Sequence, residues 1–195
     1  MKKIIALLLS SMLAFTLVAC GGEKPSAVVD KFYTALKECN KDELKTLTNK
    51  DLVKEATKTE ITKEQEDTIK KVLSSIDFKI MGTDEKDNEA TVDVEVTAID
   101  GNDIATKYIK SSLQTSLEAS LKGESEEEIT KKCSDILIKL LNEKNLKKST
   151  QTIKVNLDKV DGEWKIKDPE NVLLETFNLK NMSDFFKEFS ENKQK

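Results

Sequence analysis

The spacing of hydrophobic positions changes along this chain, and each change predicts a different kind of element. Between residues 26 and 73 the apolar positions recur every three or four residues, which is the spacing of one face of a helix. Asn40 and Thr62 are each followed three residues later by Glu or Gln, the pattern that caps the start of a helix. The region therefore predicts three helices, of which the third buries Ile69, Val72 and Leu73.

After residue 76 apolar and polar residues alternate, as in a strand with one buried and one wet face. Residues 76–80 and 90–96 form one such pair around a polar turn at residues 84–88. Alternation returns at residue 153 and continues past Asp161-Gly162 to Ile166, which predicts a second hairpin. The wet face is either a binding surface or simply solvated. Its residues are Thr91, Asp93, Glu95, Lys154 and Asn156.

Two further helices are predicted between the hairpins. The first runs from about Asp103 to Leu121, Gly123 breaks it, and Ser125 with Glu128 caps the second. Each helix carries an apolar stripe of the kind that faces a core. The stripes are Ile109, Leu113, Leu117 and Leu121 on the first helix, and Ile129, Cys133, Ile136, Leu137, Leu140 and Leu141 on the second.

The predicted fold class is therefore α+β, with N-terminal helices and a four-stranded, mostly antiparallel sheet interrupted by a helical pair. Residues 26–168 are expected to form a single domain, which is a usual domain size. Residues 169–195 are predicted as a C-terminal extension with a short helix. Its three rings, Phe185, Phe186 and Phe189, either fold back over the core, which is the simpler interpretation, or dock on a partner or the membrane surface.

Residues 1–19 have the layout of a secretory signal peptide. Lys2 and Lys3 precede an apolar run that begins at Ile4 and ends in small residues before Cys20. A retained transmembrane helix is the weaker interpretation, because such a helix needs about 20 predominantly apolar residues and this run is shorter. The first 19 residues are therefore predicted to be removed.

The four residues Leu17-Val18-Ala19-Cys20 resemble a bacterial lipobox. The resemblance implies cleavage between Ala19 and Cys20 and attachment of a diacylglyceryl group to Cys20. A single acyl chain holds a protein only marginally to a bilayer, whereas two hold it stably. Residues 20–25 would then be a lipidated N-terminus with a short tether, and the expected location is the cell membrane, facing the extracellular side.

All 32 basic residues are lysines, because the chain contains neither arginine nor histidine. Without histidine there is no Ser-His-Asp or Cys-His machinery and no imidazole metal ligand. Loss of residues 1–19 removes two lysines and changes the net charge from −4 to −6, so nucleic acid is not an expected partner. The sequence predicts no catalytic residues, no metal site and no cofactor.

Cys39 and Cys133 remain after cleavage, in a compartment where a disulfide persists. Both lie in predicted helices. They are either two small buried apolar residues or a possible disulfide pair, and their spacing does not decide between the two. A nucleophilic role is disfavoured, because no histidine is present to activate a thiol.

Clustered acids suggest a metal or acid–base site, but simpler causes account for them. The acids between Glu124 and Glu128 lie where a helix begins, and acids there complement the helix dipole. Two oxygen-rich turns do not match the pattern of a calcium loop, and turn chemistry explains both. They contain Asp84, Asp87 and Asn88, and Asp100, Asn102 and Asp103.

The helix after the lipobox, the antiparallel hairpins and the closing strand Val160-Asp161-Gly162-Glu163-Trp164-Lys165-Ile166 together resemble the nuclear transport factor 2-like (cystatin-like) superfamily. More narrowly, they resemble small lipoproteins of Gram-positive bacteria with domains of unknown function, including a group once labelled lumazine-binding. The resemblance covers residues 25–168. It implies that Trp164 and Ile166 are core residues, and no binding residue carries over.

These features lead to one functional hypothesis and two alternatives. The leading hypothesis is a membrane-anchored, non-enzymatic module that binds a small ligand or an envelope protein. The first alternative is an enzyme that uses carboxylate and lysine groups in a sheet-lined pocket, since isomerases and dehydratases occur in the superfamily. A sheet face filled by side chains would count against that alternative. The second alternative is a structural, self-associating envelope module.

Overall fold

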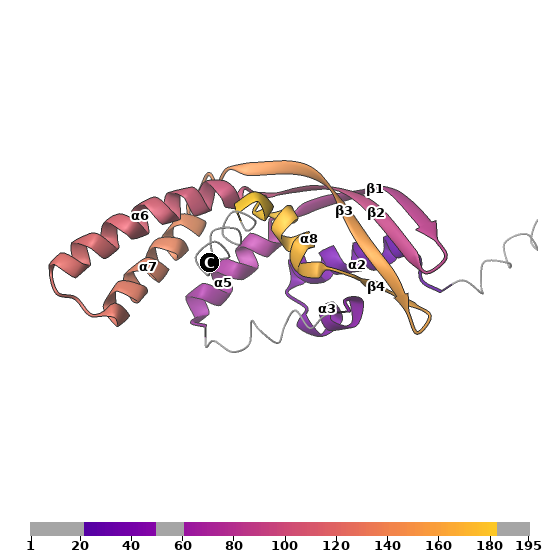
Figure 1. Cartoon of the computed structure of the whole chain (residues 1–195), viewed down its shortest axis with the longest axis horizontal. Coiled ribbons are helices and arrows are strands. Elements are labelled where there is room, and N and C mark those ends of the chain that lie inside the picture. Colours follow the sequence, from indigo (N-terminus) through magenta and orange to yellow (C-terminus); the bar gives the residue numbers. More distant parts are fainter. Residues whose placement is uncertain (1–21, 50–60, 183–195) are drawn as a thin grey trace, which may run out of the picture.

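The computed structural model describes residues 22–49 and 61–182 (Figure 1). The elements are α2 (Pro25–Glu38), α3 (Lys41–Leu47), α5 (Lys63–Ser74), β1 (Asp77–Lys86), β2 (Glu89–Ile99), α6 (Gly101–Leu121), α7 (Glu126–Leu141), β3 (Lys148–Val160), β4 (Glu163–Ile166) and α8 (Pro169–Thr176). The predicted α+β class is confirmed, because helices precede the strands and the pair α6–α7 interrupts a four-stranded sheet.

Local side-chain signals set where the helices begin. The side chain of Asn40 caps α3, and Thr62 with Gln65 forms a capping box at the start of α5. Ser125 with Glu128 forms the same box at α7. These contacts satisfy backbone N–H groups that have no partner within their own helix, so the helix starts follow directly from the sequence.

The sheet is antiparallel throughout, in the order β1-β2-β3-β4. Val94 pairs with Ile80 on one side and Ile153 on the other, so apolar side chains align on the inner face. Met81 interrupts the β1–β2 register between Ile80 and Gly82. The first hairpin is tighter than predicted, since β1 extends to Lys86 and the turn is confined to residues 87–88.

The outer face of the sheet is the predicted wet face. Thr91 donates a hydrogen bond to Asn156 at 2.9 Å, and the Lys154 ammonium lies 2.9 Å from the Asp93 carboxylate. These pairs lie directly opposite each other on β2 and β3. Cross-strand polar pairs of this kind stabilise a solvated sheet face, and they account for the polar residues there without a ligand.

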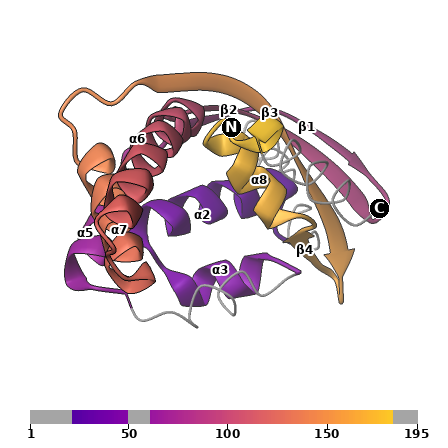
Figure 2. The ribbon, with the colours of Figure 1, turned by 60° about the vertical axis from the view of Figure 1, so that its left-hand side comes forward.

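The inner face is filled by α2 and α8 (Figure 2). Phe32 and Tyr33 of α2 are 0% exposed, and the ring of Tyr33 stacks on Phe78 with centroids 5.0 Å apart. The Tyr33 hydroxyl is hydrogen-bonded to Thr176 of α8 at 3.1 Å, and Val172 belongs to the same core. α8, which lies in the predicted C-terminal extension, thus packs against the core of the sheet.

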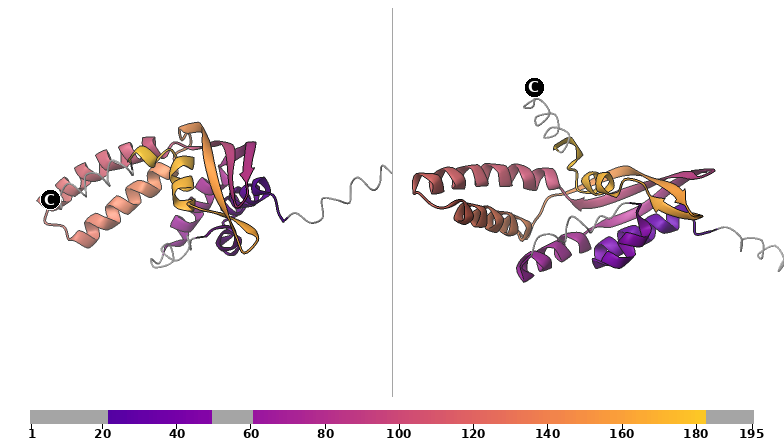
Figure 3. Two further views of the ribbon diagram at one scale, coloured as in Figure 1. Left: turned by 45° about the vertical axis from the view of Figure 1, so that its right-hand side comes forward. Right: turned by 60° about the horizontal axis from the view of Figure 1, so that its bottom comes forward.

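The molecule is elongated, and α6 with α7 forms an antiparallel pair that extends away from the sheet (Figures 1 and 3). We call this pair, Gly101–Leu141, the arm. The turn between α6 and α7 lies at one end of the long axis (Figure 1). Residues 22–24, which precede α2, lie at the other end, beside the turns of the two hairpins (Figure 1).

The expected burial of α5 is only partly correct. Ile69 is 44% exposed, and Val72 and Leu73 are half-buried. Thr68 is the buried residue of this helix, and it accepts a hydrogen bond from Asn142 at 3.0 Å. α5 meets α7 through the hydrogen bond from Gln65 to Ser134, and Val72 of α5 lines an apolar pocket with Leu137 and Leu141 of α7.

Candidate functional site

The two helices of the arm meet through small side chains of α6. Ala119 is 2% exposed, and the Ser116 hydroxyl lies 3.8 Å from the Cys133 thiol of α7. Ser112, one turn earlier on the same face, has a buried hydroxyl without a hydrogen-bond partner among the described residues. The residues of α7 are half-buried or exposed, and Tyr108 of α6 lines a pocket with Leu137 and Leu141 of α7. The seam therefore does not use the leucines of α6.

The leucines of α6 point to solvent instead. Four residues spaced by four positions form an exposed apolar strip, which we call the α6 stripe. They are Ile109, Leu113, Leu117 and Leu121, with exposed fractions of 45%, 62%, 60% and 89%. The other large exposed apolar residues of the described chain are scattered over three elements and a loop. Consecutive members of the stripe are about one helical turn apart, so they form a contiguous strip.

The root of the arm is fixed by Asp100, whose side chain is 5% exposed. Its carboxylate caps α6, lies 2.7 Å from the Lys147 ammonium and accepts a hydrogen bond from Asn178 at 3.0 Å. The hydrogen bond from Lys147 lowers the pKa of Asp100, Asn178 and the Asp103 N–H act in the same direction, and burial opposes them. The arm is thus tied to the β3 side and to the segment after α8.

Gly101 adds a steric constraint at the same root. A Cβ at this position would lie 2.6 Å from the carbonyl oxygen of Phe177 and 2.8 Å from Leu179. The Gly101 N–H also donates to that carbonyl at 2.8 Å. Only glycine permits so close an approach, so the first residue of α6 is held directly against the end of α8.

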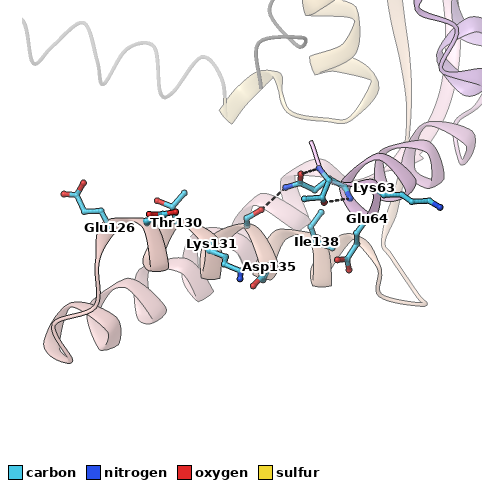
Figure 4. A pocket seen from close by; sticks show the side chains of 11 residues that line it. Lys63, Glu64, Glu126, Thr130, Lys131, Asp135 and Ile138 are labelled. Carbon is cyan, nitrogen blue, oxygen red and sulfur yellow. Dashed lines mark hydrogen bonds between the residues drawn. The ribbon is translucent and has the colours of Figure 1, made fainter. Parts of the chain in front are cut away.

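A groove of about 880 Å³ lies between α5 and α7 (Figure 4). Gln65 donates to Ser134 across it at 3.2 Å. Its charged side chains are spread along α7 and the start of α5 and do not converge on one point (Figure 4). They are Lys63, Glu64, Glu126, Glu127, Lys131 and Asp135. This mixed, open groove presents no set of convergent groups around a single reacting atom.

The curve of the sheet leaves no comparable space at its centre. Val94 and Val155 are 0% exposed and Trp164 is 5% exposed, while Phe78 is half-buried under Tyr33. Burial raises the pKa of the Tyr33 hydroxyl well above its usual range. The inner face is therefore a packed core, and Trp164 and Ile166 are core residues as predicted.

The predicted anchor residues Ala19 and Cys20, and the rings Phe185, Phe186 and Phe189, lie outside the described residues. Cys39 and Cys133 are both free and half-buried, so the possible disulfide between them is not formed. Cys39 ends α2 in a left-handed conformation, and Cys133 lies in the seam of the arm. They belong to different packing environments, which the sequence spacing could not reveal.

The acid cluster before α7 is part of a helix cap. Glu128 completes the capping box with Ser125, whose backbone and side-chain hydrogen bonds lower the pKa of Glu128. Glu124 forms an ion pair with Lys132. Asp100, in one oxygen-rich turn, caps α6, and Asp87 takes a positive φ in the other. In the described ranges no group of three or more Cys, Asp or Glu side chains could hold a metal ion.

None of the helices in residues 22–49 and 61–182 combines the length and the apolar character that crossing a bilayer demands.

Comparison with known protein families matches residues 19–193 to a family described as a domain of unknown function, DUF5105. The chain belongs to this family. The matched region begins one residue before Cys20, so the DUF5105 region starts where the predicted signal peptide ends. It continues beyond α8, which agrees with the packing of α8 in the core.

Among solved structures, this DUF5105 chain is similar to a crystal structure of a Bacillus subtilis subsp. subtilis strain 168 protein named "putative lipoprotein (ycdA)". The sequence identity is 17% and the TM-score is 0.41. The likeness covers 80% of this chain and 48% of that chain, so this chain spans about half the length of that protein. No curated protein matches this chain.

The spacing of apolar residues predicts the α6 stripe but not its exposure. A signal was present, because the neighbouring face of the same helix carries Ser112, Ser116 and Ala119. Small residues at every third or fourth position allow a second helix to approach closely. A helix with one small-residue face and a separate leucine face has two contact surfaces, and the arm uses only the first.

Proposed function

We propose that this protein is a lipid-anchored, non-enzymatic binding module on the extracellular side of the cell membrane, and that the arm is its binding element. The observation that carries the proposal is the α6 stripe. Four apolar side chains, 45–89% exposed, lie on a helix that extends away from the sheet. Exposing them costs free energy in water, which a partner would recover by covering them.

Three features support the anchor. The order of lysines, apolar run and Cys20 is that of a lipoprotein signal. The DUF5105 match begins at residue 19. Residues 22 and 23 are held against the domain, since Glu23 lies 2.6 Å from the Lys31 ammonium and Gly22 lies beside Gly162. An anchor at Cys20 would thus lie close to the hairpin-turn end, with the arm at the other end.

The packed inner face favours a protein partner over a small ligand or a pocket enzyme. We assign the domain to the nuclear transport factor 2-like (cystatin-like) type, with α2 across an antiparallel sheet, as part of this proposal. In this chain Phe32 and Tyr33 occupy the space where a ligand would lie in the curve of the sheet. The large exposed apolar surface is on the arm instead, where a flat helix face suits a protein.

The proposal is tested by chemical crosslinking of intact cells that express the tagged full-length protein. The double variant Leu113→Asp/Leu117→Asp should lose the crosslinked species that the parent forms. The matched control is Met81→Asp/Val160→Asp, which places two acids at exposed apolar positions of the sheet, 54% and 43% exposed. Equal crosslinking by all three proteins would show that the arm is not the binding element.

The anchor is tested separately. Cys20→Ser should abolish incorporation of labelled lipid and release the protein from the membrane fraction, while Cys39→Ser should do neither. Labelled lipid still incorporated into Cys20→Ser would contradict the anchor assignment.

A further inference from the structure

We infer that the α6 stripe is a self-association surface, on which a second copy of this chain docks with its α6 antiparallel to the first. This inference rests on the proposed function and names the partner of the arm. It follows from the spacing of the stripe, the residues on its two sides, and the position of the arm relative to the start of the domain.

The spacing of the stripe matches a known mode of helix packing. Residues four apart form a ridge along a helix, and two such ridges interdigitate in the commonest class of helix–helix contact. A twofold axis between Leu113 and Leu117 would place each of these residues beside the other in the second copy. The same axis would place Ile109 beside Leu121 of the second copy.

The side of the stripe nearest α7 offers a groove. The neighbouring ridge there consists of Ser112, Ser116 and Ser120, whose side chains are much smaller than leucine. Leucines of a second α6 would therefore have space beside the leucines of the first. Of these serines, Ser120 is exposed and Ser116 is half-buried, so part of the groove remains open to a second chain.

The other side of the stripe carries complementary charges. Lys110 and Glu118 lie eight residues apart, about 12 Å along the helix. Lys110 has no ion pair with any other described residue. In the antiparallel arrangement, Lys110 lies within about 3 Å, measured along the axis, of the position opposite Glu118 of the second copy. In a parallel arrangement in register, the flank that carries Lys110 and Glu118 would instead face the serine ridge of the second copy, and this charge pair would not form.

The position of the arm favours a second copy over the membrane. The arm extends away from residues 22–24, so the stripe is remote from the predicted tether (Figures 1 and 3). Four side chains bury less area than the roughly 800 Å² per partner of a typical specific complex. Two copies held on one membrane have a high effective concentration, which allows so small a surface to associate.

Disulfide crosslinking in the membrane tests the arrangement. Two differently tagged full-length copies are co-expressed, one with Leu113→Cys and the other with Leu117→Cys, and intact cells are treated with a mild thiol oxidant. A dimer that carries both tags should form at least about tenfold more than in the control, where both copies carry Asp135→Cys on the exposed surface of α7. Absence of this excess would overturn the inference.

A charge exchange provides an independent test that does not depend on cysteines in the stripe. In chemical crosslinking of intact cells, with the stripe residues unchanged, Lys110→Glu should lower the yield of the dimer about fivefold. Two exposed ion pairs of modest strength would be lost. Adding Glu118→Lys to the same chain should restore the yield to within about twofold. Failure of the second substitution to restore the dimer would contradict the antiparallel pairing.

The outcomes separate this inference from the proposed function. If the stripe cysteines crosslink to a different protein, the second copy is ruled out and the arm remains a binding element. If a stripe cysteine forms a disulfide only with a cysteine introduced within residues 183–195 of the same chain, both proposals fail. If they react only with lipid-soluble thiol probes, the stripe faces the membrane and both proposals fail as well.

Discussion

Two regions of the molecule contain similar apolar side chains but bury them to different degrees. One region is the sheet with its covering helix α2, and the other is the arm. Val92 and Val94 of the sheet are 0% exposed, whereas Leu113 and Leu117 of the arm are 62% and 60% exposed. The sheet residues are covered by α2 and α8, which are distant from them in sequence. Within the described residues, α6 has α7 beside it along most of its length (Figure 1). The sheet half therefore buries its apolar side chains, while the arm leaves those of the α6 stripe exposed.

The largest difference in unfolding free energy is expected when one large apolar side chain in each region is replaced by alanine. Phe32→Ala should lower the free energy of unfolding by about 3–5 kcal/mol, because it leaves a cavity in a fully packed core. Leu117→Ala should change it by less than about 0.5 kcal/mol, since the side chain is already 60% exposed. Urea unfolding of the mature chain with Cys20→Ser measures both. A large loss for Leu117→Ala would show that the stripe is structural.

A smaller effect is expected where the two regions join. Asp100→Ala removes the cap of α6 and the partner of Lys147 and Asn178. We expect a loss of about 1–3 kcal/mol, together with faster amide exchange at the start of α6. Asp103→Ala, on the same helix turn, serves as the control and should cost less. Unchanged exchange in Asp100→Ala would show that the arm is held by other contacts.

The same joint should respond to pH. The pKa of Asp100 is lowered in the folded state, so its carboxylate contributes stability above its unfolded-state pKa, about 3.9. That contribution is lost as the pH falls through the folded-state pKa. The difference in unfolding free energy between the parent and Asp100→Asn should therefore be constant above about pH 5 and shrink at lower pH. A constant difference down to about pH 2 would contradict the lowered pKa.

Much of the fold could be predicted because its signals are local. Alternation assigned Val92, Val94 and Val155 to one sheet face, and that face is buried. Thr62 with Gln65 and Ser125 with Glu128 marked helix starts that the structure confirms. In each case a residue and its neighbours a few positions away contain all the information.

The features of the fold that could not be predicted depend on contacts between residues far apart in the sequence. Whether the sheet encloses a cavity is decided by Phe32 and Tyr33, which lie far before the strands that they cover. The inclusion of α8 depends on Thr176 reaching Tyr33. The exposure of Leu113 depends on α7 using the serine face of α6. Periodicity identifies an apolar face but does not say which neighbour covers it.

The smallest predicted change in unfolding free energy comes from replacing one turn glycine in each region. Gly162, in the β3–β4 turn, and Gly123, at the tip of the arm, have φ values of +87° and +73°, and a Cβ added at either position would meet no atom within 4 Å. Alanine at either site should therefore cost about 1 kcal/mol from backbone strain alone.

For Gly162→Ala the loss should appear in global unfolding, since the turn joins two strands of the core. For Gly123→Ala it should appear as faster amide exchange in α6 and α7, with less change in the urea midpoint. Equal shifts of the midpoint for both variants would mean that the arm and the sheet unfold as one unit, and the distinction between the two regions would then be one of exposure but not of stability.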